Sequence, residues 1–97
     1  MKKIRPFQVN LQVDFIKQGK SYIAYSPALD LSTSGKTQKE AQKRFEEAVD
    51  IFFEEVAEND CLEKALTDLG WKKLKTKWNP PQVIKQESLD FKVPVPA

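Results

Sequence analysis

The sequence contains no histidine and only one cysteine, and these two shortages remove whole classes of chemistry. Histidine is the commonest general base and the commonest metal ligand in proteins. A Ser-His-Asp triad and a Cys/His zinc site are therefore both excluded. Cys61 has no partner for an internal disulfide, which is typical of a reducing compartment, so we expect a cytoplasmic protein.

Long apolar runs are also missing. No stretch approaches the roughly 20 apolar residues that a membrane-spanning helix needs. The basic start Met1-Lys2-Lys3 leads into a segment interrupted by Gln8, Asn10, Gln12 and Asp14, which predicts that there is no signal peptide. Ninety-seven residues of ordinary composition suit one domain with a modest core.

Carboxylates are the remaining candidates for catalysis, and the predicted strands carry few of them. A two-metal nuclease site needs several acids that converge from strand ends. Only Asp14 and Asp30 are available, and Asp14 lies in phase with the polar residues of its strand. We therefore predict a protein that is not an enzyme, with no catalytic residue, no cofactor and no metal site. A metal-dependent nuclease using Asp14 and Asp30 is kept as a minor alternative.

Glycine is scarce too, and this decides how Gly35-Lys36-Thr37 is interpreted. The triplet matches the end of a phosphate-binding loop, but that loop needs another glycine five positions before Gly35. Asp30 stands there, and its carboxylate would repel phosphate. The residues instead indicate a strand-to-helix junction, in which Thr37 and Glu40 form a capping box.

The N-terminal third is patterned as strands. Apolar residues alternate with polar ones from Phe7 to Phe15, which predicts a half-buried strand. Residues 17–20 are a turn with Gly19, and Ser21–Ser26 pairs back as a hairpin that Pro27 ends. A short third strand is expected over residues 29–34.

Two helices follow. A stripe of apolar residues at helical spacing predicts a helix from Thr37 to about Glu58; its members are Ala41, Phe45, Ala48, Val49, Phe52 and Val56. Asp60 and Glu63 suggest a second capping box before a short helix that Gly70 closes. Residues 71–78 are predicted to form a strand or small hairpin, and the tail an edge strand restricted by Pro94 and Pro96. The expected fold is α+β, in the order β-β-β-α-α-β, with an antiparallel sheet of three to four strands covered on one face by the long helix.

Charge is segregated along the chain. Residues 37–58 hold three basic and seven acidic residues, for a net charge of −4. Four of the acids recur at helical spacing opposite the apolar stripe: Glu47, Asp50, Glu54 and Glu58. Acids near a helix C-terminus interact unfavourably with the helix dipole, so helix stability does not explain them. They form either an ordinary solvated face or a docking surface for a basic partner.

Residues 71–81 carry four lysines and no acid. These lysines are interleaved with two tryptophans, giving the candidate nucleic-acid-binding set Trp71, Lys72, Lys73, Lys75, Lys77 and Trp78. Lysines can follow phosphates while aromatic rings stack on bases. Edge strands also carry lysine to discourage aggregation, and the tryptophans could instead close the core under the second helix. Ile51 lies off the apolar stripe and suggests self-association.

Residues 22–55, YIAYSPALDLSTSGKTQKEAQKRFEEAVDIFFEE, resemble the HicB antitoxin domain. The matching features are an aromatic second strand ending in proline, a short third strand, Gly-x-Thr, and a long helix opened by Glu-Ala. The residues that carry them are Tyr22, Ala24, Pro27, Leu29, Gly35, Thr37, Glu40, Ala41, Glu47 and Ala48.

This resemblance implies a partial, degenerate ribonuclease-H-like fold without the ancestral active site. It also implies a partner, a HicA-type toxin, which is a small basic protein that cleaves mRNA and is neutralised when the antitoxin covers its active site. Such antitoxins commonly form dimers or tetramers. The implied division is a HicB-like domain over residues 1–81 and a C-terminal extension over 82–97 that acts as an edge strand or oligomer contact.

Two departures distinguish this chain from many members of that family. Only 16 residues follow Pro81, too few for the helix-turn-helix or ribbon-helix-helix that binds an operator, so DNA is not an expected partner. The frequent Leu-Pro-Gly-Cys is replaced by Leu29-Asp30-Leu31-Ser32. The chain looks like the short, stand-alone branch.

Overall fold

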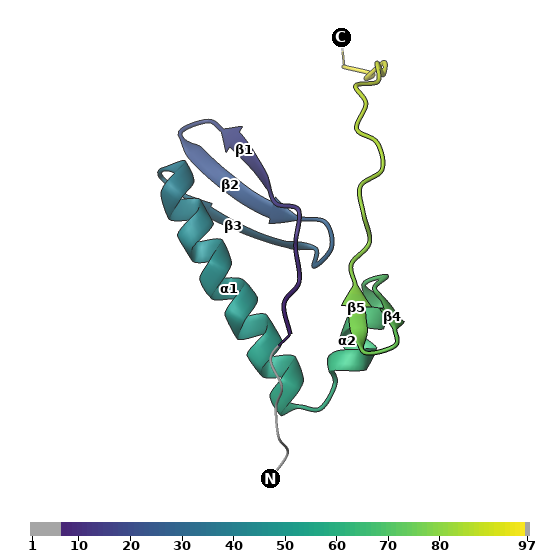
Figure 1. Ribbon diagram of the computed structural model, residues 1–97. Helices are drawn as coiled ribbons and strands as arrows, with labels where there is room; N and C mark the ends of the chain where they lie inside the picture. The colour runs from purple at the N-terminus through teal and green to yellow at the C-terminus, as the bar shows by residue number, and fades with distance from the viewer. Residues whose placement is uncertain (1–6, 97) are drawn as a thin grey trace.

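The computed structural model describes residues 7–96 and has α+β architecture (Figure 1). The basic start of the chain, Met1-Lys2-Lys3, lies outside this range. The elements are β1 (Asp14–Gln18), β2 (Ser21–Ser26), β3 (Leu31–Gly35), α1 (Gln38–Glu58), α2 (Leu62–Asp68), β4 (Lys72–Leu74) and β5 (Lys77–Asn79). None of the helices in the described part of the chain has the length and apolar character needed to cross a membrane.

Three strands form an antiparallel sheet in the order β1-β2-β3. Gly19 adopts φ 60° in the turn between β1 and β2, and Pro27 follows the last residue of β2, as the sequence predicts. The turn has only two residues, because Lys17 and Gln18, which were predicted to lie in it, belong to β1. Asp30, at φ 49°, completes the turn into β3, where its backbone N–H donates to the carbonyl of Pro27 over 3.3 Å. β3 therefore begins at Leu31 rather than at residue 29.

The predicted strand from Phe7 to Phe15 is wrong over most of its length, because β1 begins only at Asp14. The register with β2 ends where Asp14 meets Tyr25, and only Ser26 remains in β2 beyond that pair, so there is no strand for the earlier residues to pair with. Val9, Leu11 and Val13 nevertheless pack against the core. The alternation correctly indicates which side chains face inward, although residues 7–13 have no partner strand.

α1 crosses one face of the sheet and packs on β3 and β2 (Figure 1). Its bounds and its apolar stripe agree with the prediction: Ala41, Phe45 and Val56 are buried, while Val49 and Phe52 are half-buried against the core. The helix ends in a Schellman motif, in which Cys61 N–H donates to the carbonyl of Val56 and Asp60 N–H to that of Ala57.

The predicted capping box of Asp60 and Glu63 is wrong. Asp60 occupies the left-handed position of the Schellman motif at φ 55°, so it ends α1 rather than opening α2. The N-cap of α2 is Cys61, which makes no side-chain capping bond and is a half-buried free thiol. Gly70 closes α2 as expected, at φ 92°, with Trp71 N–H donating to the carbonyl of Leu66.

The last strands do not join the main sheet. β4 and β5 form a separate two-stranded hairpin, so residues 71–78 are the small hairpin that the sequence allowed. Residues 80–96 form no strand. The chain beyond the hairpin runs away from the rest of the protein in Figure 1, and the predicted edge strand does not form in a single chain.

Candidate binding surfaces

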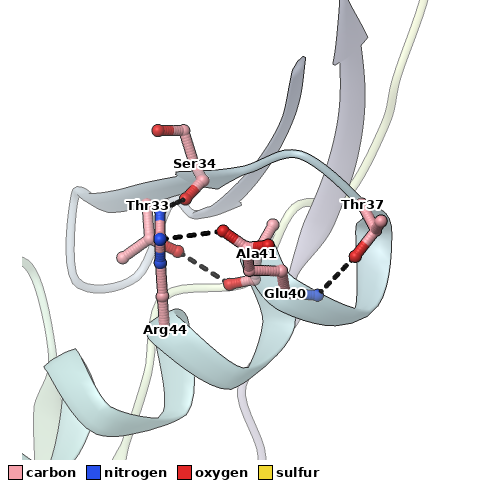
Figure 2. A network of polar contacts seen from close by, with 6 residues as sticks. All are labelled: Thr33, Ser34, Thr37, Glu40, Ala41 and Arg44. Atoms are coloured by element: carbon pink, nitrogen blue, oxygen red, sulfur yellow. Dashed lines mark hydrogen bonds and ion pairs between the residues drawn. The ribbon is translucent and has the colours of Figure 1, made fainter. Parts of the chain in front are cut away.

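The junction between β3 and α1 is a tightly bonded structural element (Figure 2). Thr37 Oγ1 accepts a hydrogen bond from Glu40 N–H over 3.0 Å, which is half of the predicted capping box. The other half does not form, because the Glu40 carboxylate pairs with Arg44 at 2.8 Å. Arg44 also donates to the carbonyl of Ser34, and Thr33 Oγ1 donates to that of Ala41, each over 2.9 Å.

Gly35 lies at the centre of this junction for a steric reason. A Cβ placed on it would lie 2.6 Å from the backbone nitrogen of Ala41, closer than real Cβ atoms approach. The sequence suggested a glycine that lets the strand turn into the helix, whereas the structure shows one that lets strand and helix touch. The N–H of Ala41 itself donates to the carbonyl of Thr37 over 3.0 Å, as the first turn of the helix requires.

Asp14 and Asp30 approach the same tyrosine. Asp14 pairs with Tyr25 across the β1–β2 ladder, and the Tyr25 hydroxyl donates to Asp30 Oδ1 over 3.2 Å. Loss of solvation, the hydrogen bond to Asp30 and the negative charges of Asp30 and Asp14 all raise the pKa of Tyr25. Across residues 7–96, no group of three or more potential metal-ligating side chains comes together. Both aspartates therefore act on Tyr25, and neither belongs to such a group within the described residues.

The acidic face of α1, defined as Glu47, Asp50, Glu54 and Glu58, is fully on the surface. All four side chains are exposed, and within the described part of the chain none of them forms an ion pair. The last turn of α1 contains no basic residue that would offset the helix dipole. The face is thus a row of uncompensated carboxylates along a rigid helix, which a basic partner could bind.

Ile51 lies on the flank of α1 and is 55 % exposed. It is a single large apolar side chain on an otherwise charged surface, and isolated exposed apolar residues are common in monomeric proteins.

β4, β5 and the turn between them form the basic hairpin. The two tryptophans of the predicted nucleic-acid-binding set have different environments around it. Trp71 precedes β4 and is only 2 % exposed; its indole Nε1 donates to the carbonyl of Ala28 over 2.8 Å. Its ring meets the ring of Phe53 edge-on, with 6.5 Å between centroids. Trp71 is therefore a core residue, as the alternative interpretation of the sequence allowed, and its ring is not available for stacking on a base.

Trp78 is half-buried and packs against the same core from β5. Lys73, its partner in the ladder, places Nζ 5.7 Å from the centre of the Trp78 ring. Lys72, Leu74 and Lys77 alternate onto the opposite face of the hairpin, and Lys75 lies in the turn at φ 58°. The solvent-facing surface of the hairpin is therefore basic and carries Leu74, which is 65 % exposed, but no aromatic ring.

An open apolar groove, which the sequence analysis did not anticipate, runs between α1 and the chain leading into β1. It has a volume of about 520 Å³. Its lining residues are Val9, Leu11, Val13, Phe15, Gln42, Phe45, Glu46, Val49 and Asp50. The alternation from Phe7 to Phe15 could have indicated this groove, because the row of apolar side chains begins well before the first residue of β1.

Comparisons with protein-family models, with curated proteins and with solved structures found no match to this chain.

Proposed function

We propose that this protein is a non-catalytic binding module of the HicB antitoxin type, which neutralises a HicA-type, mRNA-cleaving toxin by direct binding. The observation that carries the proposal is the acidic face of α1. A toxin that acts on RNA must present positive charge to its substrate, so a rigid row of carboxylates is complementary to the surface that such a toxin uses. Binding there would exclude RNA from the toxin.

The coarse architecture supports the same proposal. Three antiparallel strands followed by a long helix across one face is the arrangement that the HicB resemblance implies over residues 22–55. Under this proposal the sheet is a partial ribonuclease-H-like fold that serves as a scaffold. The antitoxin would then act in the cytoplasm, where the mRNA substrate of the toxin is found.

Reversing two charges on the acidic face should weaken toxin binding strongly. The double variant Glu47→Lys/Glu54→Lys is expected to bind a HicA-like toxin roughly 100-fold more weakly in isothermal titration calorimetry, because like charges would then face each other across the contact. Its free energy of unfolding should stay within about 0.5 kcal/mol of the native value, since both side chains are exposed.

The control is Glu63→Lys/Asp68→Lys on α2, which changes the net charge by the same amount at exposed positions and removes only the exposed ion pair of Asp68 with Lys64. This variant should bind the toxin normally and restore growth when co-expressed with it. Equal weakening by both variants would show that net charge, rather than the acidic face, governs binding. No binding of any HicA-like toxin by the unaltered chain would reject the proposal itself.

The basic hairpin supports a second candidate function, RNA binding. The specific observation is the lysine-rich outer surface formed by Lys72, Lys75 and Lys77. Each phosphate contact to single-stranded nucleic acid contributes roughly 0.7 to the slope of log K against log salt concentration. If these lysines bind RNA, the triple alanine variant should lower that slope by roughly 2, measured by fluorescence anisotropy with a labelled single strand.

The control removes three other exposed lysines, Lys36, Lys39 and Lys43, which lie around the start of α1. It should leave the slope unchanged. A native chain whose RNA affinity does not depend on salt, or equal losses in the two triple variants, would count against the hairpin as an RNA site.

A further inference from the structure

The apolar groove exists because α1 does not cover the whole sheet. The helix packs mainly on β3 and β2, which leaves β1 and the chain leading into it only partly covered. Val13 and Phe15 line one wall of the groove, and Phe45 and Val49 line the other. Phe15, which lines the groove from β1, is 38 % exposed. The groove therefore offers apolar surface that an additional strand beside β1 would bury.

β1 is an edge strand, and its free amides belong to the residues that line the groove. The two-residue turn makes Gln18 and Ser21 the closing pair of the hairpin, and residues in such a pair bond to each other. Bonding alternates along an antiparallel ladder, so Asp14, Ile16 and Gln18 bond to β2. The N–H and C=O groups of Phe15 and Lys17 consequently point away from β2, toward the free edge of the sheet.

The C-terminal arm, residues 84–96, has the complementary pattern. Its large apolar residues alternate and are exposed: Leu89 62 %, Phe91 80 %, Val93 76 % and Val95 78 %. Both late prolines, Pro94 and Pro96, fall on the intervening positions. Because successive residues of a strand direct their amides to opposite edges, the prolines remove donors from one edge only. The edge formed by the odd-numbered residues keeps every N–H.

These two patterns fix the direction in which the strands could pair. In an antiparallel pair, two opposite residues can hydrogen-bond to each other, and their side chains lie on the same face of the sheet. In a parallel pair, a residue hydrogen-bonds instead to the two residues that flank its counterpart. β1 offers the amides of its groove-facing residues, so an antiparallel arm would use its odd, apolar residues. A parallel arm would instead use its even-numbered residues, and this edge lacks the N–H groups of Pro94 and Pro96.

The arm of the same chain runs in the wrong direction for this pairing. In Figure 1, β1 and the arm both run from the lower to the upper part of the view, and the arm leaves the body of the protein.

The start of the tail lies against the body of the protein, where Pro80 and Pro81 line a separate cavity of about 230 Å³ together with Asn10 and Gln12. The radius of gyration is 16.9 Å, against about 12.5 Å expected for a compact chain of this length. Within residues 7–96, a single chain thus leaves both the arm and the groove without a partner.

We propose that the occupant of the groove is a second copy of this chain. The arm of each copy lies antiparallel to β1 of the other, with Leu89, Phe91 and Val93 over the groove, in a reciprocal exchange about a two-fold axis. A two-fold axis perpendicular to the strands reverses strand direction. An arm that is parallel to its own β1 is therefore antiparallel to β1 of the partner. Extended, the 13 residues of the arm reach about 43 Å, enough to cross between two copies. This self-association does not rest on the proposed toxin binding.

Proline scanning of the arm tests the proposal in the full-length protein. Sedimentation equilibrium should give the native chain twice its mass of 11.2 kDa. Val93→Pro removes a donor from the pairing edge of both arms and should weaken dimerisation roughly tenfold or more. Lys92→Pro adds the same residue one position away, in phase with Pro94, and should leave the dimer intact. Neither change disturbs the monomer, because both side chains are exposed.

A change in the groove completes the test. Phe15→Lys places a charge where the arm would lie and should weaken the dimer as Val93→Pro does, while circular dichroism shows that the chain is folded. A monomeric native protein overturns the proposal, and so does equal weakening by the two prolines. A dimer that is sensitive to Val93→Pro but not to Phe15→Lys would show that the arms pair elsewhere, which also overturns it.

Discussion

Replacing Gly35 with alanine is expected to lower the free energy of unfolding by about 3 kcal/mol, the upper part of the usual range for overpacking. The added Cβ would lie 2.6 Å from the backbone nitrogen of Ala41 and 3.0 Å from the carbonyl carbon of Glu40. Both neighbours are backbone atoms in the first turn of α1, so they cannot move aside as a flexible side chain would. The start of α1 must therefore move away from β3. This movement lengthens the hydrogen bonds from Arg44 to the Ser34 carbonyl and from Thr33 to the Ala41 carbonyl.

The control is Gly19→Ala in the turn between β1 and β2. Gly19 has φ 60°, and a Cβ added to it would meet no other atom within 4 Å, so alanine there has only the intrinsic cost of a left-handed backbone, about 1 kcal/mol. Urea denaturation followed by circular dichroism compares the two variants. If Gly35→Ala costs no more than Gly19→Ala, close contact is not what requires glycine at the junction.

Replacing Trp71 with alanine is expected to cost about 4 kcal/mol, near the value typical of a fully buried large aromatic side chain. The substitution removes the edge-on contact with Phe53 and the packing against Leu66. It also leaves the carbonyl of Ala28 without the indole donor that lies 2.8 Å away. A domain of this size is stable by roughly 5–15 kcal/mol, so this one change removes between about a quarter and most of that stability.

Trp78→Ala provides the comparison, since Trp78 is half-buried and its partner across the ladder is the exposed Lys73. It should cost about 1–2 kcal/mol. The two midpoints of urea unfolding, followed by circular dichroism, separate a core tryptophan from a surface one. Equal costs would contradict the distinction. Loss of RNA binding by a Trp71 variant would therefore report unfolding, and an RNA site must be tested on the lysines instead.

The helices show what a sequence of this kind predicts well. Thr37 is followed by apolar residues that recur every three or four positions, and both signals act within the helix itself. The start, the end and the buried stripe of α1 could therefore be predicted from local residues. The function of its acidic face could not, because an exposed carboxylate looks the same whether or not a partner binds it.

Errors arose where the outcome depends on distant parts of the chain. Alternation from Phe7 to Phe15 reports that one side faces the core, but a strand also needs a neighbour, and β2 ends at Ser26. Aspartate is a common N-cap residue, but Asp60 adopts the left-handed conformation that ends α1 and is therefore not the N-cap of α2. The burial of Trp71 depends on a carbonyl 43 residues earlier, which no local pattern of lysines and tryptophans can indicate.

The two late prolines of the arm have a consequence for solubility. A strand added to a sheet normally becomes the new edge and presents a fresh row of amides to any further strand, which is how amyloid-like growth begins. Pro94 and Pro96 have no N–H, and their shared phase directs both gaps to the outer side. Once the arm is paired with β1, its outer edge would lack N–H donors at Pro94 and Pro96. The arm would therefore pair with one strand but would not readily accept a further strand on its outer side.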